Sequence, residues 1–224
     1  MSKARIIIYG VAQQAQQLRH YIELEDQGTI IAHVIDDAYK QAKCPDMQEL
    51  NGVPVICFSE MIGRYAPEEV FVANSLAYSH MVADRERVHK QCKAEGYRMF
   101  TFISKAANVY AAEVGEGTII YPGCMIGYHV RLGEGNFIDV STTIAHDSVV
   151  GPFNFFAPNV TLCGGIHVAD HCFIGAGAVI LNGGSLEPRA LIAAGAVVRD
   201  AEADGVYFAA RTTKWHGTSS EIKI

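Results

Sequence analysis

Residues 114–198 repeat with a period of six, which constrains the fold more than any other feature of the sequence. A large apolar residue opens every block and the phase never changes, as shown by Val114, Ile120, Ile126, Leu132, Ile138, Ile144, Val150, Phe156, Leu162, Val168, Ile174, Ile180, Leu186, Ile192 and Val198. Neither a helix nor a single alternating strand produces this spacing. A fixed period of six predicts a parallel β-helix, in which three sides of six residues complete a coil of eighteen.

The fifth residue of each block is usually small. This position holds Thr118, Cys124, Asn136, Thr142, Ser148, Cys172, Ala178, Gly184, Ala190 and Ala196. A narrow prism has room for one bulky residue per side beside a small one, because protein interiors pack as densely as organic crystals. The fifth positions therefore support the same β-helix, whose coils should lie about 4.8 Å apart, the usual spacing of strands.

The chain before residue 104 follows a different pattern, in which apolar strands alternate with helices. Arg5–Tyr9 is predicted as a buried strand ended by Gly10, followed by a helix over 11–24 and a second strand over 29–35. This βαβ opening is typical of dinucleotide-binding folds. Further strands are predicted over 53–57, 69–73 and 98–103, with a helix over 81–95. We predict a Rossmann-like α/β domain with a mostly parallel sheet over residues 1–104, and a β-helix domain with a C-terminal tail over 105–224.

Composition restricts the possible partners. The net charge of −6 gives no basic footprint for nucleic acid. Six scattered cysteines without a CxxC pair predict neither a disulfide framework nor a structural zinc site. No apolar stretch approaches the roughly 20 residues of a membrane span. The sequence predicts a soluble protein of the reducing cytoplasm, without a membrane span.

Several motifs in the repeat resemble one enzyme family. Ile144-Ala145-His146-Asp147-Ser148, Ala157-Pro158-Asn159, Gly164-Gly165 and the stretch from Ile174 to Ala178 resemble the hexapeptide-repeat acyltransferases. Within them, the pattern is similar to bacterial sugar acyltransferases that acylate nucleotide-linked amino sugars, and to sialic acid O-acetyltransferases. The resemblance implies left-handed coils, a homotrimer with coenzyme A at the seam between two β-helices, acetyl-CoA or another short acyl-CoA as co-substrate, and no metal.

His146 is the candidate general base. It occupies the third position of its block, an outward or corner position where a histidine has no core role, so an ordinary surface histidine is the alternative. Imidazole, with an unperturbed pKa near ~6.5, can take the proton that an attacking amine or hydroxyl must lose. The resemblance places His146 and Asp147 on the family's catalytic pair, with Asp147 orienting the ring. Adjacent residues point to opposite faces of a straight strand, so the pairing requires a corner here.

Glycine and alanine positions above His146 are the candidate coenzyme site. Gly164 lies eighteen residues after His146, so it should lie one coil above, where its bare N–H could bind a tetrahedral oxyanion. The same resemblance points to Gly164, although a turn with positive φ would also favour glycine. Ala176 and Ala194, again eighteen apart, match small positions where the family lays the pantetheine arm of coenzyme A.

The predicted acceptor site draws on both domains. Gly10, before the first helix, could place backbone amides near a phosphate, although the family's other glycines are missing from this turn. Asp36 and Asp37 match an acidic pair that lies near the nucleotide base and ribose in the family; a solvated loop pair is the alternative. Asp139 falls where the family commonly has an asparagine close to the acceptor sugar. Outside the acceptor site, Phe155 falls where some members carry a second histidine near the coenzyme.

The sequence leaves the function between alternatives. The favoured hypothesis is acyl transfer from acyl-CoA to the amine of a nucleotide-linked amino sugar, for surface glycan biosynthesis. O-acetylation of a free sugar acid such as sialic acid is the first alternative, and the shortened Gly10 turn favours it slightly. A non-catalytic nucleotide-binding β-helix is the second. A zinc site like that of γ-class carbonic anhydrases is disfavoured, because His129, His167 and His171 occupy different block positions.

Overall fold

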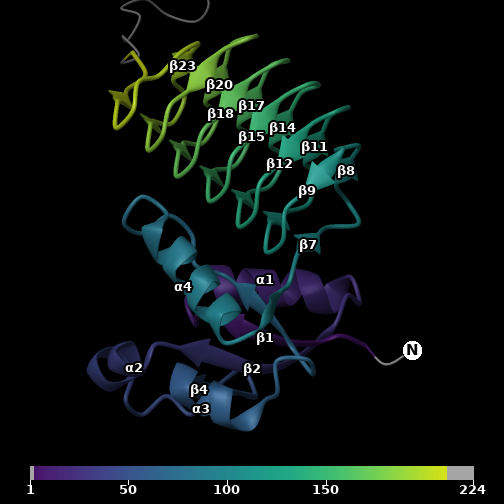
Figure 1. Cartoon of the computed structure of the whole chain (residues 1–224), viewed down its shortest axis with the longest axis vertical. Helices are drawn as coiled ribbons and strands as arrows, with labels where there is room; N and C mark the ends of the chain where they lie inside the picture. Colours follow the sequence, from purple (N-terminus) through teal and green to yellow (C-terminus); the bar gives the residue numbers. More distant parts are fainter. Residues whose placement is uncertain (1–2, 211–224) are drawn as a thin grey trace, which may run out of the picture.

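The computed structural model describes residues 3–210, so part of the predicted C-terminal tail, with Trp215, lies outside the described residues. An α/β domain at one end supports a β-helix that rises from it (Figure 1). The α/β domain contains β1 (Arg5–Tyr9), α1 (Gln13–Leu24), β2 (Thr29–Ile35), α2 (Asp37–Lys43), β3 (Glu49–Leu50), β4 (Val53–Cys57), α3 (Phe58–Arg64), β5 (Phe71–Asn74), α4 (Ala83–Ala94) and β6 (Arg98–Met99).

The sheet of this domain has the strand order β3-β4-β2-β1-β5-β6. All its pairs are parallel except β3 with β4. The chain moves from β1 outward through β2 to β4, then crosses to β5 on the other side of β1. The carboxyl ends of β1 and β5 therefore form a topological switch point, where open α/β sheets bind ligands.

The predicted strand over 98–103 divides between the two domains. After β6, Phe100 still donates its N–H to Val72 of the first sheet, whereas Phe102 donates to Thr118 of the β-helix. Phe102–Ile103 is therefore the first strand of the β-helix, β7. Both halves of the stretch are extended and apolar. The strands with which they form hydrogen bonds decide the domain to which each half belongs, and the sequence does not reveal these strands.

The rest of the chain forms three parallel sheets of two-residue strands, which are the three faces of a prism. Face 1 contains β7, β10 (Ile119–Ile120), β13 (Phe137–Ile138), β16 (Phe155–Phe156), β19 (Phe173–Ile174), β22 (Leu191–Ile192) and β24 (Val206–Tyr207). Face 2 contains β8 (Asn108–Val109), β11 (Met125–Ile126), β14 (Thr143–Ile144), β17 (Thr161–Leu162), β20 (Val179–Ile180) and β23 (Val197–Val198). Face 3 contains β9 (Glu113–Val114), β12 (Arg131–Leu132), β15 (Val149–Val150), β18 (His167–Val168) and β21 (Ser185–Leu186).

The register confirms the predicted coil. Phe137 pairs with Phe155 on face 1 and Thr143 with Thr161 on face 2, each eighteen residues apart. The apolar residue that opens each block is the second residue of its strand, and from Ile120 to Ile192 all of them are almost completely buried. The structure is the left-handed parallel β-helix that the resemblance implied.

Some fifth positions carry buried polar side chains rather than apolar ones. Asn136 donates from Nδ2 to the carbonyls of Gly133 (2.7 Å) and Gly151 (3.0 Å), while its Oδ1 accepts the N–H of Asn154 (2.9 Å). Asn154 repeats the arrangement one coil above, where its Oδ1 accepts the N–H of Cys172 at 2.7 Å. The amides thus meet the requirement that buried polar groups be hydrogen-bonded.

Face 1 packs against the α/β domain. Its outward aromatic rings form a stack, with centroids 5.2 Å apart for Phe137 and Phe155 and 5.5 Å apart for Phe155 and Phe173. These rings share one buried cluster with β1 and with the inward side of α1, represented by Leu18 and Ile22. The two domains therefore have a common core, which fixes their relative position.

Arg85 of α4 is completely buried at this junction. Its guanidinium donates to the carbonyls of Gly135 (2.6 Å), Leu76 (2.8 Å) and Gly117 (2.9 Å), and to that of Asn74. It forms no ion pair with any described carboxylate. Burial lowers the pKa of Arg85 to about 9, so the side chain remains charged at neutral pH. Charge-assisted bonds to carbonyls of both domains hold α4 against the β-helix.

We expect Arg85→Met to destabilise the protein by about 3 kcal/mol, because several buried carbonyls lose their donors together. Arg64→Met, at an exposed arginine of α3, is the control and should change stability by less than about 0.5 kcal/mol. Urea unfolding followed by circular dichroism measures both. Equal midpoints for the two variants would contradict the role assigned to Arg85.

Candidate functional site

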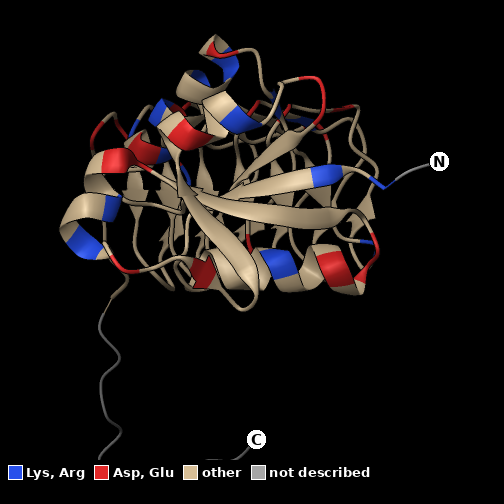
Figure 2. Cartoon of the chain, turned by 90° about the horizontal axis from the view of Figure 1, so that it is seen from below, with Lys and Arg blue, Asp and Glu red and all other residues tan. Residues whose placement is uncertain are grey.

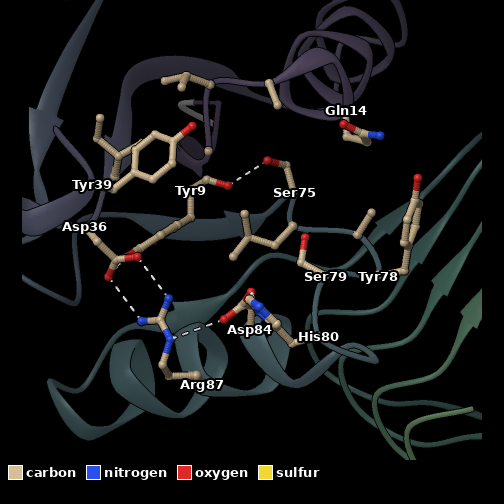
Figure 3. Close-up of a pocket in the computed structure, with 16 residues that line it drawn as sticks. Tyr9, Gln14, Asp36, Tyr39, Ser75, Tyr78, Ser79, His80, Asp84 and Arg87 are labelled. Carbon is tan, nitrogen blue, oxygen red and sulfur yellow. Dashed lines mark hydrogen bonds and ion pairs between the residues drawn. The ribbon is translucent and has the colours of Figure 1, made fainter. Parts of the chain in front are cut away.

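The α/β domain has a cavity of 530 Å³ at the switch point. It is lined by Tyr9, Gly10, Val11, Ala12, Gln14, Ile35, Asp36, Tyr39, Ser75, Leu76, Ala77, Tyr78, Ser79, His80, Asp84 and Arg87. Figure 3 shows Asp36 and Arg87 on one side and Gln14 and Tyr78 on the other. The loops after β1, β2 and β5 supply most of this lining, as expected for a ligand site in this kind of fold.

Asp36 is the centre of a polar network in the cavity (Figure 3). Arg87 donates to both of its carboxylate oxygens, at 3.1 and 2.9 Å, and the hydroxyl of Tyr9 donates to Oδ1 at 2.7 Å. Burial, and then the bond to Asp36, raise the pKa of Tyr9, so the phenol stays protonated. The bond to Asp36 also raises the pKa of Arg87. Asp36 is therefore a fixed hydrogen-bond acceptor, which could bind hydroxyl or N–H groups of a ligand.

Asp37 does not join this network. Its carboxylate accepts the backbone N–H of Ser59 at 3.2 Å and also the Ser59 hydroxyl at the start of α3. These bonds are the main reason why the pKa of Asp37 lies below its usual value. The structure thus separates the predicted acidic pair: Asp36 lines the cavity, and Asp37 connects α2 to α3.

Gly10 lies at the tip of β1 with φ +120°, in the region that favours glycine. A Cβ at this position would collide with Oγ of Ser75. The hydroxyl of Ser75 donates to the carbonyl of Tyr9 at 2.6 Å. Gly10 is therefore required for a close approach between the loops after β1 and β5, and it lines the cavity as predicted.

His146 and Asp147 lie at the corner where face 2 meets face 3, between β14 and β15. Asp147 has φ +58°, and this turn brings its Oδ2 to 2.9 Å from Nδ1 of His146. A carboxylate only accepts hydrogen bonds, so Nδ1 carries a proton, and in the neutral form of the ring Nε2 has the lone pair. The bond from His146 is the main reason that the pKa of Asp147 lies below its usual value. The corner required for the pair is present.

His129 is a neighbour that the sequence analysis did not place at this site. It lies one coil below Asp147, with Nδ1 3.4 Å from Oδ1 of Asp147. The ring of Tyr128 stacks on His129 at 3.6 Å. Subtracting eighteen from the number of Asp147 would have found it. Asp147 is thus held between two imidazoles from successive coils.

Gly164 lies directly above the ring of His146. A Cβ built at Gly164 would be 2.6 Å from Nε2 of His146 and 3.1 Å from Oδ1 of Asn182, one coil higher. Within the described residues, the N–H of Gly164 makes no hydrogen bond, because the inter-coil bonds use the N–H groups of Cys163 and Gly165. Only glycine at position 164 leaves room for the imidazole of His146. Within the described part of the chain, the N–H of Gly164 is an unpaired hydrogen-bond donor beside that ring.

Ala176 and Ala194 lie at a different corner, where face 1 meets face 2. Both are exposed, and they stack through the bond from Gly195 N–H to the carbonyl of Ala176. Asp139 is half-buried at the same corner, where its Oδ1 accepts the N–H of Val140 at 2.7 Å. Burial raises the pKa of Asp139. Asp139 therefore shares this corner with the two alanines but lies two coils below Ala176, and face 2 separates all three residues from His146.

A single chain does not unite the two candidate sites. The cavity belongs to the domain that packs on face 1, while His146 lies at the corner opposite that face.

The described residues contain no group of three or more histidine, cysteine, aspartate or glutamate side chains that could hold a metal ion. Among them, no helix is long and apolar enough to cross a membrane. Basic and acidic residues alternate over the helices at the end of the molecule shown in Figure 2.

Three solved structures share this fold over nearly the whole chain. The acetyltransferase domain of PglB from Neisseria gonorrhoeae has a TM-score of 0.80 at 18% identity, covering 92% of this chain and 97% of that one. A variant of perosamine N-acetyltransferase from Caulobacter crescentus, in complex with CoA and GDP-perosamine, has a TM-score of 0.81 at 19% identity, covering 92% and 94%. WeeI from Acinetobacter baumannii has a TM-score of 0.72 at 22% identity, covering 88% and 94%.

No protein-family model and no curated protein matches the sequence significantly. The fold that the chain shares with the three solved structures confirms, at the level of the fold, the resemblance to hexapeptide-repeat sugar acyltransferases that the motifs indicated.

We expect Gly164→Ala to move the imidazole of His146 while leaving the melting temperature nearly unchanged. The ring is about two-thirds exposed, with 65% of the side chain accessible, so it can turn away from the new methyl group at little cost. Gly183→Ala, where an added Cβ meets no atom within 4 Å, is the control for substitution in this corner, although its φ of +66° adds some strain. NMR of the histidine ring nitrogens, with a crystal structure, measures the change. A ring that keeps its bond to Asp147 in the Gly164→Ala protein would contradict the packing described.

Proposed function

We propose that the protein is an acyl-CoA-dependent sugar N-acyltransferase. It transfers an acetyl or other short acyl group to the amine of a nucleotide-linked amino sugar, in the biosynthesis of a surface glycan. The observation that carries the proposal is the His146–Asp147 pair, with Nε2 of the ring directly beneath the bare backbone of Gly164. The cytoplasm, where acetyl-CoA is made, is the proposed location.

The geometry suits a general-base mechanism. The amine nitrogen of the sugar attacks the thioester carbon, and Nε2 of His146 takes the proton that the nitrogen loses. The tetrahedral intermediate then collapses, the carbon–sulfur bond breaks, and the imidazolium returns the proton to the leaving thiolate of coenzyme A. Asp147 holds the tautomer and stabilises the imidazolium. The amide product and free coenzyme A thiol balance the reaction.

Gly164 is proposed as the donor for the oxyanion. Its N–H makes no other hydrogen bond within the described residues, and it belongs to the coil above the base. A donor at this place would bind the carbonyl oxygen most strongly when its negative charge develops. Asn182, one coil higher, lies beside Gly164, with its Oδ1 3.1 Å from a Cβ built there.

The cavity of the α/β domain is proposed as the nucleotide site. Asp36 would accept hydrogen bonds from the ribose or base, and the turn after Gly10 would receive the diphosphate. Asp139 would contact the acceptor sugar. GDP-perosamine is bound in the Caulobacter crescentus structure named above, and acetyl-CoA in one structure of the Neisseria gonorrhoeae domain; both support this assignment of substrate classes.

The separation of the cavity from His146 supports a site formed by two chains. Ala176 and Ala194 on one chain would contact the pantetheine arm, while His146 and Gly164 come from the neighbouring chain. Face 2 presents uncharged outward residues for such packing, namely Met125, Thr143, Thr161, Val179 and Val197. We propose a homotrimer with coenzyme A at each seam, because three prisms can close symmetrically.

O-acetylation of a free sugar acid remains the second candidate, because of one observation. The only arginine that lines the cavity, Arg87, is already paired with Asp36, so no unpaired lysine or arginine among the described lining residues awaits a diphosphate. A free sugar has no diphosphate, so its binding would not need an unpaired lysine or arginine for that group.

We expect His146→Ala to lower kcat by about 10²–10⁴-fold, the usual contribution of a general base. The residue is exposed, so the fold should remain intact, and the loss should lie in kcat because proton removal belongs to the transition state. His167→Ala, at an exposed histidine of β18, is the matched control. Thiol release from acetyl-CoA in the presence of amino-sugar nucleotides measures both; a kcat within about threefold of the parent would make His146 a surface histidine.

We expect at least one UDP-, dTDP- or GDP-linked amino sugar to bind the α/β domain, and Asp36→Ala to weaken that binding about tenfold through loss of a charged hydrogen bond. Asp37→Ala, beside it but outside the cavity, is the control. Calorimetry with acetyl-CoA present measures the affinities. Heat from sialic acid and none from any nucleotide sugar would favour the second candidate.

A further inference from the structure

His33 is a buried histidine that the mechanism does not use. It lies in the middle of β2, opposite Ile8 of β1, and none of its surface is exposed. Its Nδ1 is 2.9 Å from the carbonyl oxygen of Gly10, whereas its Nε2 has no partner within the described residues. Burying an imidazole nitrogen without a hydrogen-bond partner costs folding free energy. The function of His33 must therefore lie in the bond that its Nδ1 makes.

The carbonyl fixes the tautomer of the ring. An oxygen lone pair faces Nδ1, so Nδ1 must carry the proton and donate it to Gly10. Burial, the largest influence, lowers the pKa of His33, so the ring is neutral and the unpartnered Nε2 is a lone pair rather than a second N–H. The neutral Nδ1–H form is the only one that suits both nitrogens.

The bond to His33 sets the direction of the Gly10–Val11 peptide. Side chains alternate across a strand, so His33 lies on the face opposite Ala32 and Val34, which pack against α3 and α4. The carbonyl of Gly10 therefore points to the α1 face. In a trans peptide the N–H points opposite to the carbonyl, so the N–H of Val11 is directed away from the α1 face, to the side of Tyr9 and Arg87, which line one wall of the cavity.

The carbonyl before this one is also turned away from the cavity. The carbonyl of Tyr9 accepts both the hydroxyl and the N–H of Ser75, at 2.6 and 3.1 Å. The N–H groups of Val11 and Ala12 make no hydrogen bonds within the described residues. Two carbonyls that would repel an anion are thus occupied, and two amides that would attract one are left free.

We infer that His33 is a positioning residue for the diphosphate of the nucleotide sugar: its Nδ1–H holds the Gly10 carbonyl so that the amides after it face the ligand. The inference rests on the proposed nucleotide site. It explains how a turn with a single glycine and no unpaired cation can receive a diphosphate, because fixed backbone dipoles replace the missing side-chain charge.

The test compares substitutions that keep or remove the donor. Asparagine can place its Nδ2 near the position of Nδ1, whereas glutamine reaches only towards Nε2, and leucine has no donor. We expect His33→Leu and His33→Gln to raise the Kd of the nucleotide sugar, and its KM, about tenfold, with His33→Asn within about threefold of the parent. The KM for acetyl-CoA and the kcat should stay within about twofold in all three.

Ile30→Val, a buried change in the same strand, is the control for a general loss of stability, and melting temperatures accompany every titration. If His33→Leu does not fold, the comparison of glutamine with asparagine decides, since both are polar and of similar size. Equal nucleotide-sugar affinity for the parent, glutamine and asparagine proteins would overturn the inference while leaving the proposed function standing. A parent protein that binds no nucleotide sugar would overturn both.

Discussion

The eighteen-residue coil is the constraint on which the rest of the structure depends. Each inter-coil hydrogen bond joins residues in a fixed register, so every position of the block has one neighbour above and one below, about 4.8 Å away. This register places Gly164 over His146 and His129 under Asp147. A strand of two residues leaves no freedom for slippage, because a shift by one would expose the whole apolar row. The candidate catalytic geometry is thus a direct consequence of the repeat.

The junction between the domains determines where the ligand cavity lies relative to that geometry. Arg85 and the aromatic stack of face 1 fix the α/β domain on one side of the prism, and His146 lies at the opposite corner. A buried guanidinium that donates to carbonyls of both domains allows little relative movement. In the proposed mechanism, a second chain rather than a hinge within one chain closes the distance between the two parts of the site.

The sequence predicted periodic features well and non-local contacts poorly. The strands Arg5–Tyr9, Thr29–Ile35 and Val53–Cys57 have the predicted bounds, and the inward positions of the β-helix are the predicted ones. Counting by eighteen placed Gly164 correctly above His146. The sequence predicts that Asp36 and Asp37 act as a pair, because nothing near them in the chain reveals that Arg87 binds Asp36 and Ser59 binds Asp37. The roles of Arg85 and His33 could not be predicted from the sequence. Both side chains bind backbone carbonyls of residues distant in the chain, and any residue type can supply a carbonyl.

In the proposed mechanism the cavity of one chain works with His146 of another, and mixed oligomers provide a direct test. Two inactive proteins are needed: His146→Ala, and Ala12→Trp, which fills the cavity from an exposed position at the start of α1. Acyl transfer is measured for each alone and for an equal mixture that has been dissociated and reassembled. The mixture should recover activity at about one site in four, the share in which random assembly joins an intact cavity to an intact base. A reassembled mixture as inactive as its two components would show that each chain carries its own complete site, and would rule out a site shared between two chains.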